Sequence, residues 1–340
     1  MRRRAPVFAL FFLSPLVAEY LSGTTLPIYL LFLIVPFSLY YGSGALLIRE
    51  VTRRTGRGWP AILTLGLAFG ILEEGVLTQS LFNPNYLAEN LHLLDPGYVE
   101  ALGMGTLWTV FVLGGHMLWS IGTPVAIVEE STRSRRTAPW LGRVGLVVTT
   151  VLFVLGCLME FVVTKAEDTK APFSASPAQV GVSAAVVVAL VVVAFLLPHG
   201  ARPPVPGQAP SPWLVFAATL VAGAGWGLLA GATSLPSWQA SVAIALACLV
   251  VLGVLVARWS RLDGWGAWHR LAVPAGALAT SGWHAFAMDY SKPPVVDHVG
   301  RTIYLLAAAW IVWLAARKVR KQDPAPVRPG DGVVPIAPLQ

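Results

Sequence analysis

"WPAILTLGLAFGILEEGVLTQSLF", residues 59–82, is an apolar run long enough to cross a membrane, and it contains two adjacent carboxylates, Glu73 and Glu74. A helix rises 1.5 Å per residue, so about 20 apolar residues span the ~30 Å of hydrocarbon in a bilayer. The run follows an arginine-rich segment and ends before Asn83 and Pro84. It therefore predicts a transmembrane helix with two acidic groups inside it.

The composition of the whole chain agrees with this interpretation. Of its 340 residues, 56% are hydrophobic and only 12% are charged, whereas a soluble domain carries about 25% charged residues. The apolar residues form continuous blocks and do not alternate with polar ones, which argues against a β-barrel. We expect an all-α, polytopic helical membrane protein with about ten transmembrane helices. The ten blocks are residues 7–22, 26–48, 59–82, 104–128, 140–163, 179–197, 213–231, 238–257, 269–290 and 302–316.

The positive charges follow the pattern that sets membrane orientation. The formal net charge is +7, but the arginines cluster in short connections at 49–58, 129–139 and 258–270, while the connection at 83–103 has no Lys or Arg. Cytoplasmic connections carry such an excess of Lys and Arg. We expect both termini in the cytoplasm and the protein in the cell membrane, with the lipid bilayer and not nucleic acid as its partner.

Proline-rich segments suggest where the chain divides. Residues 198–212 read as a Pro-rich cytoplasmic linker between an N-terminal six-helix half, 1–197, which holds the candidate polar site, and a C-terminal four-helix half, 213–316. The tail at 317–340 begins with four cations, each of which would attract anionic lipids by about 1 kcal/mol. The Pro-rich remainder of the tail is expected to be disordered.

The first apolar block also resembles a signal peptide, because it follows a basic start. No Ala-x-Ala cleavage site follows, and Glu19 lies where the cut would be expected. These two observations favour a retained first helix. Cleavage would leave nine spans with the same orientation.

Ionisable residues inside the predicted spans are the candidates for function. Glu73 and Glu74 lie near the middle of the third span, His116 near the middle of the fourth, and His284 in the outer part of the ninth. A charge at the bilayer centre costs roughly 2.5–3.5 kcal/mol. We expect the two imidazoles to meet the two carboxylates in a shared polar cavity, and we take all four residues as catalytic candidates.

Short side chains near these residues would support the site. Ser120 follows His116 by one turn and Ser281 precedes His284 by one turn, so both hydroxyls could orient an imidazole. Small residues let helices approach closely, and glycines precede both the glutamates and His116. For the acidic residues near the span ends we expect a structural role. These residues are Glu19, Glu160 and Asp289.

The pair Glu73–Glu74, a histidine in the next span (His116) and a later histidine (His284) resemble the intramembrane CAAX-prenyl-protease and bacteriocin-processing family. That family carries a Glu-Glu-x-x-x-Arg motif, a Phe-x-x-x-His motif and a later His followed by Asn. The resemblance implies cleavage of a peptide bond within a membrane cavity. A glutamate would activate water, and the histidines would bind a metal or stabilise the oxyanion.

The chain departs from this pattern at three places. Thr78 stands where the first motif has Arg, and Val112 stands where the second has Phe, which is displaced to Phe111. After the later histidine, Met288 stands where Asn is expected, and Asp289 follows it. We retain Thr78 and Asp289 as supporting candidates.

Three classes of function remain open. The first is an intramembrane protease-like hydrolase acting on a peptide or lipid-like substrate. Glu74, His116 and His284 could hold a divalent metal such as zinc, with one position open for water. The second is a proton-coupled transporter or flippase that exchanges protons between carboxylate and imidazole. The third is a non-catalytic membrane scaffold whose polar residues only fix helix packing.

Overall fold

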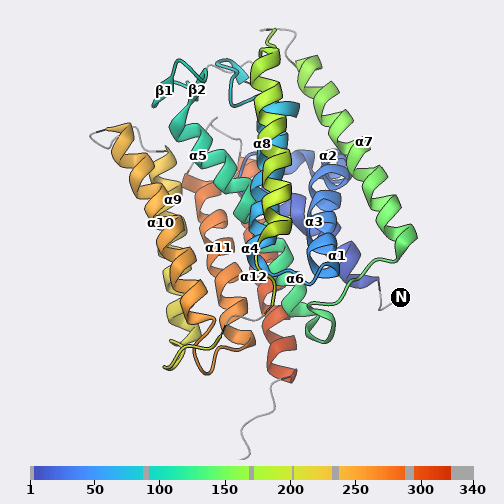
Figure 1. Ribbon diagram of the computed structural model, residues 1–340, viewed down its shortest axis with the longest axis vertical. Helices are drawn as coiled ribbons and strands as arrows, with labels where there is room; N and C mark the ends of the chain where they lie inside the picture. The colour runs from blue at the N-terminus through green and yellow to red at the C-terminus, as the bar shows by residue number, and fades with distance from the viewer. Residues whose placement is uncertain are drawn as a thin grey trace, which may run out of the picture.

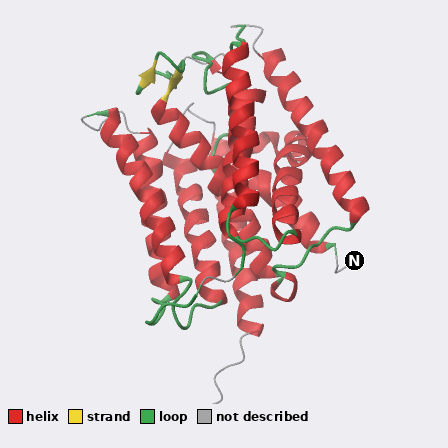
Figure 2. Cartoon of the chain, in the orientation of Figure 1, coloured by secondary structure: helices red, strands yellow, loops and turns green. Residues whose placement is uncertain are grey.

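The run that contains Glu73 and Glu74 folds as helix α4, Trp59–Leu72, and continues as the π-helix η4, Glu73–Leu77, in the computed structural model of the protein (Figure 1). Other helices surround this rod, and the only strands in the described part of the chain are two short ones at one end (Figure 2). The protein is thus an all-α, multi-pass membrane protein, as the sequence predicts. The structure describes residues 4–86, 92–167, 172–200, 203–231, 237–287 and 295–322.

Several rods are built from consecutive helical segments. The N-terminal segments are α1 (Ala5–Pro15), η1 (Leu16–Tyr20), η2 (Pro27–Tyr29), α2 (Leu30–Phe37), η3 (Ser38–Gly42) and α3 (Ser43–Arg54). The hairpin strands β1 (Tyr98–Val99) and β2 (Met104–Gly105) precede α5 (Thr106–Gly115), η6 (His116–Gly122), α6 (Thr123–Ser131) and η7 (Arg133–Arg135). The later helices are α7 (Arg143–Glu167), α8 (Pro177–Leu196), α9 (Pro212–Gly231), α10 (Trp238–Trp259), α11 (Ala267–Ala287) and α12 (Val295–Gln322).

Each of the ten apolar blocks coincides with a helical rod. Among the residues that the structure describes, seven rods are long and apolar enough to cross a membrane. Two more are shorter apolar helices, Ala5–Tyr20 and Pro212–Gly227. The tenth is α11, in which polar residues interrupt the apolar pattern. The tail prediction shifts by a few residues, because α12 runs to Gln322 and so includes the four cations placed in the tail.

Burial separates an inner pair of rods from an outer shell. About 61% of the apolar window is buried in both Trp59–Leu77 and Thr106–Ser131, but only 11% in the α7, α8 and α10 spans. The outer helices expose Val and Leu side chains, as expected for surfaces in contact with lipid. The carboxylates and His116 therefore lie on the two most enclosed rods.

The arginine-rich connections gather at one end of the bundle, together with the N-terminus and the end of α12 (Figure 1). Hydrogen bonds join them: Arg49 donates to the Arg136 carbonyl (2.7 Å) and Arg270 to the Glu130 carboxylate (2.7 Å). The β1–β2 hairpin lies at the opposite end. This arrangement is what the positive-inside pattern requires. The cytoplasmic assignment, the division into two halves and the attraction of the tail to anionic lipids stay predictions.

Several of these charges are more deeply buried than a loop assignment suggests, because α3 extends to Arg54. Arg49 is fully buried, and its Nε lies 3.0 Å from the buried Glu129 carboxylate. Arg53 lies 2.7 Å from the same carboxylate. The Arg49 guanidinium also lies 3.6 Å from the ring centroid of Trp140. These contacts compensate charges that would be costly to bury alone.

Candidate functional site

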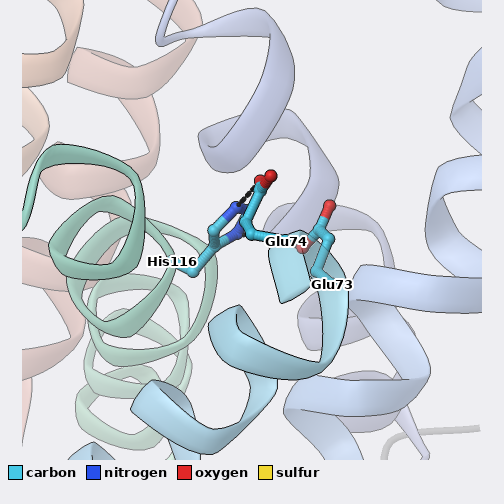
Figure 3. Close-up of side chains that lie close together, drawn as sticks. All are labelled: Glu73, Glu74 and His116. Atoms are coloured by element: carbon cyan, nitrogen blue, oxygen red, sulfur yellow. Dashed lines mark hydrogen bonds and ion pairs between the residues drawn. The ribbon is translucent and has the colours of Figure 1, made fainter. Parts of the chain in front are cut away.

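Glu73, Glu74 and His116 converge in the interior of the bundle (Figure 3). One ligand atom from each lies within 4.8 Å of the others, and the three residues are only 3%, 5% and 8% exposed. The glutamates begin η4 and the histidine begins η6, so two neighbouring rods supply the group. Glycine makes this approach possible, because a Cβ on Gly70 would lie 3.0 Å from the Cβ of His116. The predicted meeting of carboxylates and imidazole is confirmed for these three residues.

The imidazole of His116 lies between the two carboxylates. Its Nε2 is 2.7 Å from Glu74 Oε1, and its Nδ1 is 3.1 Å from Glu73 Oε2. Nδ1 also lies 3.1 Å from the hydroxyl of Ser120, as predicted from their one-turn spacing. Both ring nitrogens of His116 therefore lie within hydrogen-bonding distance of oxygen atoms, which hold the ring in place.

Hydroxyl groups fix the second oxygen of Glu74. Oε2 accepts hydrogen bonds from Thr78 Oγ1 (3.1 Å) and from the hydroxyl of Ser80. The indole of Trp108 in turn donates to Ser80 Oγ (3.3 Å). Thr78 therefore supports the site, although it stands where the resembling family has Arg. With both oxygens engaged, Glu74 is held in one orientation against His116.

Glu73 is held from the other side by a residue that the sequence did not single out. The hydroxyl of Tyr41 donates to Glu19 Oε1 (2.6 Å) and lies within hydrogen-bonding distance of Glu73 Oε1. Thr25 Oγ1 donates to the second oxygen of Glu19 (3.0 Å), and the Tyr41 ring stacks on His116 at 6.0 Å. A hydroxyl has one proton and can donate it to only one of the two carboxylates at a time. The second contact therefore requires a proton on the other carboxyl group.

Tyr41 and the four ionisable residues of this network all lie on π-helical segments. Glu19 lies in η1, Tyr41 in η3, both glutamates in η4, and His116 in η6. π-helix makes up well under 1% of residues in proteins and is frequent at functional sites. The wider turn shows in the backbone bond from Thr78 N to Glu73 O, which spans five residues (2.9 Å). Four separate rods thus deform at the level where they meet.

Prolines and one buried serine explain part of this deformation. Pro15 directly precedes η1, and Pro124 lies just after η6. A proline lacks the N–H that would continue the α-helical ladder and so leaves a carbonyl without its partner. The buried hydroxyl of Ser14 donates to one such carbonyl, that of Ser120 four residues before Pro124 (2.6 Å), and also contacts the Tyr41 carbonyl (3.1 Å). One side chain therefore ties two π-helical segments together.

His284 lies outside the group formed by the two glutamates and His116. Its ring is 5.8 Å from that of Phe111, and its Cδ2 lies 3.2 Å from where a Cβ on Gly227 would be. Its Nε2 and the hydroxyl of Ser281 are buried without a hydrogen-bond partner. Asp289 lies outside the described residues. The structure thus separates His284 from the glutamates, and its catalytic role stays a prediction.

The three converged residues could hold a divalent metal. Two carboxylates and one imidazole form the ligand type found in catalytic zinc sites, with a fourth position left for water. Their ligand atoms already lie within 4.8 Å of one another. The metal ligands expected from the sequence are Glu74, His116 and His284. In the structure Glu73, and not His284, lies with the other two.

Comparison with known proteins places the chain in context. A family model described as an uncharacterized membrane protein family matches residues 8–200. This region is more than half of the chain and contains Glu19, Tyr41, both glutamates and His116. No curated protein and no solved structure matches the chain.

Proposed function

The chain belongs to this uncharacterized membrane protein family, and from that premise we propose that it is an intramembrane hydrolase that cleaves a peptide bond. The observation that carries the proposal is the coincidence of four π-helical segments with one buried network of carboxylates, tyrosine and histidine. A scaffold needs polar contacts between helices, but it does not need four rods to deform around one imidazole. The site lies among apolar helices, so its substrate would be a peptide or lipid-like molecule within the bilayer.

In this proposal Glu73 is the general base. Its Oε2 makes no hydrogen bond and has only the 3.1 Å ion-pair contact with His116, while both oxygens of Glu74 accept hydrogen bonds or contact the imidazole. Glu73 takes a proton from water, and the water oxygen bonds to the carbonyl carbon of the peptide. The C–N bond then breaks, and the amine leaves with the proton that Glu73 took. The side chain of His116, which lies beside Glu73, would stabilise the negative charge that develops on the carbonyl oxygen.

The remaining contacts position these groups. Glu74 orients His116 through its 2.7 Å contact, and Tyr41 fixes the other oxygen of Glu73. Glu19 exchanges a proton with the Tyr41 hydroxyl, which lies between Glu19 and Glu73. A zinc ion held by Glu73, Glu74 and His116 would supply a bound water of lowered pKa.

The second candidate is a proton-coupled carrier. One observation favours it: contacts run without a break from Glu19 through Tyr41, Glu73 and His116 to Glu74. Chains of carboxylate and imidazole groups relay protons in pumps and transporters. A carrier must also open this chain to both faces of the membrane, whereas a hydrolase needs access from one side.

A comparison of membrane peptides tests the hydrolase. Cells that express the wild type, Glu73→Gln or Glu100→Gln are compared by mass spectrometry of newly formed peptide termini in their membranes. Glu100 is exposed in the connection before β2, so its substitution makes the same chemical change outside the site. We expect new peptide termini in cells that express the wild type or Glu100→Gln, and none of these termini in cells that express Glu73→Gln. Identical termini in all three, with proton flux into proteoliposomes lost only in Glu73→Gln, would reject the hydrolase in favour of the carrier.

A further inference from the structure

A hollow of about 200 Å³ lies at the arginine-rich end of the bundle, on a different part of the molecule from the proposed catalytic site. Three connections meet there: α3 to α4, η7 to α7, and the segment after α8. These connections directly adjoin the ends of membrane-spanning helices. The hollow therefore lies at the depth of the lipid headgroups. Its lining is Arg53, Gly56, Arg57, Gly58, Thr137 and Gly200.

The described residues of the lining are positively charged or neutral, and none of them is a carboxylate. The charge of Arg53 is matched by Glu129 at 2.7 Å. Arg57 instead donates to two neutral carbonyls, those of Thr55 (3.2 Å) and Phe195, and its guanidinium lies 5.4 Å from the Phe195 ring centroid. Its Nε is buried without a hydrogen-bond partner. Within the described residues Arg57 thus has a fixed position and a charge that no carboxylate in ion-pair range balances.

Glycines leave the rest of the wall open. Gly56 and Gly200 have φ values of +69° and +102°, and a Cβ on either would meet nothing within 4 Å. Gly58 is the N-cap of α4 and has no side-chain cap. The N–H groups of Trp59 and Ala61 in the first turn of this 14-residue helix therefore have no side-chain acceptor, while the proline between them has no N–H. Helix N-termini and guanidinium groups both favour phosphate.

We propose that this hollow binds a phosphate group, carried by an anionic phospholipid headgroup or free in solution. Pockets for drug-sized ligands measure about 300–1,000 Å³, so a hollow of about 200 Å³ suits a phosphate and not a larger ligand. The guanidinium of Arg57 and the N-terminus of α4 contact the phosphate oxygens. The acyl chains of a lipid would lie outside, along the apolar surface of the adjoining spans.

Thr137 provides a test that leaves the arginines in place. It is exposed and lines the hollow, so its substitution does not disturb the core. Purified full-length protein is analysed by native mass spectrometry with phosphatidylglycerol or phosphatidylcholine, and by thermal unfolding with inorganic phosphate. We expect Thr137→Glu to weaken phosphatidylglycerol binding by about tenfold, because it places a carboxylate beside the phosphate. Thr137→Gln introduces a side chain of the same size as glutamate but without its charge, and this variant should bind phosphatidylglycerol as the wild type does.

A second pair of variants separates the hollow from general surface charge. Arg57→Gln should lose the bound phosphate group, whereas Arg143→Gln, which removes an exposed arginine at the start of α7, should keep it. Preferential retention of phosphatidylglycerol supports a lipid headgroup. Stabilisation by inorganic phosphate without lipid preference supports free phosphate. Equal behaviour of Thr137→Glu and Thr137→Gln, equal losses in the two arginine variants, or no response to either ligand would overturn the proposal.

Discussion

The hydroxyl of Tyr41 allows a direct test of the polar network, because this one oxygen contacts two of its carboxylates. It lies 2.6 Å from Glu19 and also contacts Glu73, and the tyrosine is only 3% exposed. Tyr41→Phe removes this one oxygen and leaves the ring stacked on His116. The substitution creates no large cavity, so its effect reports on the lost contacts.

The expected magnitude follows from two scales. A hydrogen bond to a charged group contributes about 1.5–3 kcal/mol in soluble proteins, whereas hydrogen bonds between membrane helices average about 0.6 and reach about 1.7 kcal/mol. The Tyr41 hydroxyl serves two carboxylates and its loss leaves the buried Glu73 without this donor. We therefore expect Tyr41→Phe to lower the free energy of unfolding by about 1.5 kcal/mol.

The neighbouring Tyr40 gives a matched control. It lies on the same π-helical segment and is fully buried, but its hydroxyl has no hydrogen-bond partner. Its ring stacks on Phe69 at 4.7 Å and would do so equally as phenylalanine. Tyr40→Phe should therefore leave stability unchanged or raise it, because an unpaired buried hydroxyl is costly.

The assay is reversible unfolding of the purified protein in mixed detergent micelles, followed by helicity. A double-mutant cycle with Glu19→Gln should give a coupling energy of about 1 kcal/mol between Tyr41 and Glu19. Equal stability changes in Tyr41→Phe and Tyr40→Phe, or a coupling energy near zero, would show that the bridge does not form.

Two further predictions concern the metal and the helix packing. Zinc at about one hundred times its dissociation constant should stabilise the protein by about 2.7 kcal/mol; thermal unfolding should show this shift in wild type and in His284→Gln and lose it in His116→Gln, and the reverse pattern would assign the metal to the other histidine. Gly42→Ala should destabilise by roughly 1–3 kcal/mol or more, because its Cβ would lie 2.1 Å from the Phe11 carbonyl oxygen. Gly181→Ala on α8 meets nothing within 4 Å and should stabilise by about 1 kcal/mol; chemical unfolding that ranks these two glycine variants alike would contradict the packing argument.

Hydrophobic patterning predicts most of the fold. Each membrane helix must satisfy its own backbone hydrogen bonds, so each span appears in the sequence as a continuous apolar segment of matching length. The same reasoning finds Glu73, Glu74 and His116, since a charge amid apolar residues is conspicuous. It also predicts Ser120 from its one-turn spacing. These inferences depend on local sequence alone.

The contacts of Tyr41 and Glu19 depend on how the rods pack, and no local sequence pattern predicts them. A tyrosine in a span reads as an interfacial aromatic, and Glu19 near a helix end reads as a structural charge. Only the approach of η1, η3 and η4 turns them into one bridge. The proline at Pro15 is the one local hint, because it marks the point at which α1 becomes π-helical.

The two polar layers of the protein bear on which function is correct. His116 and Glu129 belong to the same continuous rod, 13 residues apart by numbering, which corresponds to about 20 Å along a helix. Between them Ile121 and Val125 are fully buried. Along the rod of η3 and α3, the buried Ala45 likewise lies between Tyr41 of the polar network and Arg49.

On both rods, uncharged side chains, which apart from Thr123 and Ser43 are mainly small or apolar, thus separate the carboxylate–histidine network from the paired charges at the arginine-rich end. A carrier would have to hydrate this layer and also part the buried Arg49–Glu129 pair, and breaking a buried pair costs about 3–5 kcal/mol. A hydrolase needs neither step, because it requires access from only one side of the membrane. The division into two polar layers therefore favours chemistry within the membrane over passage through it.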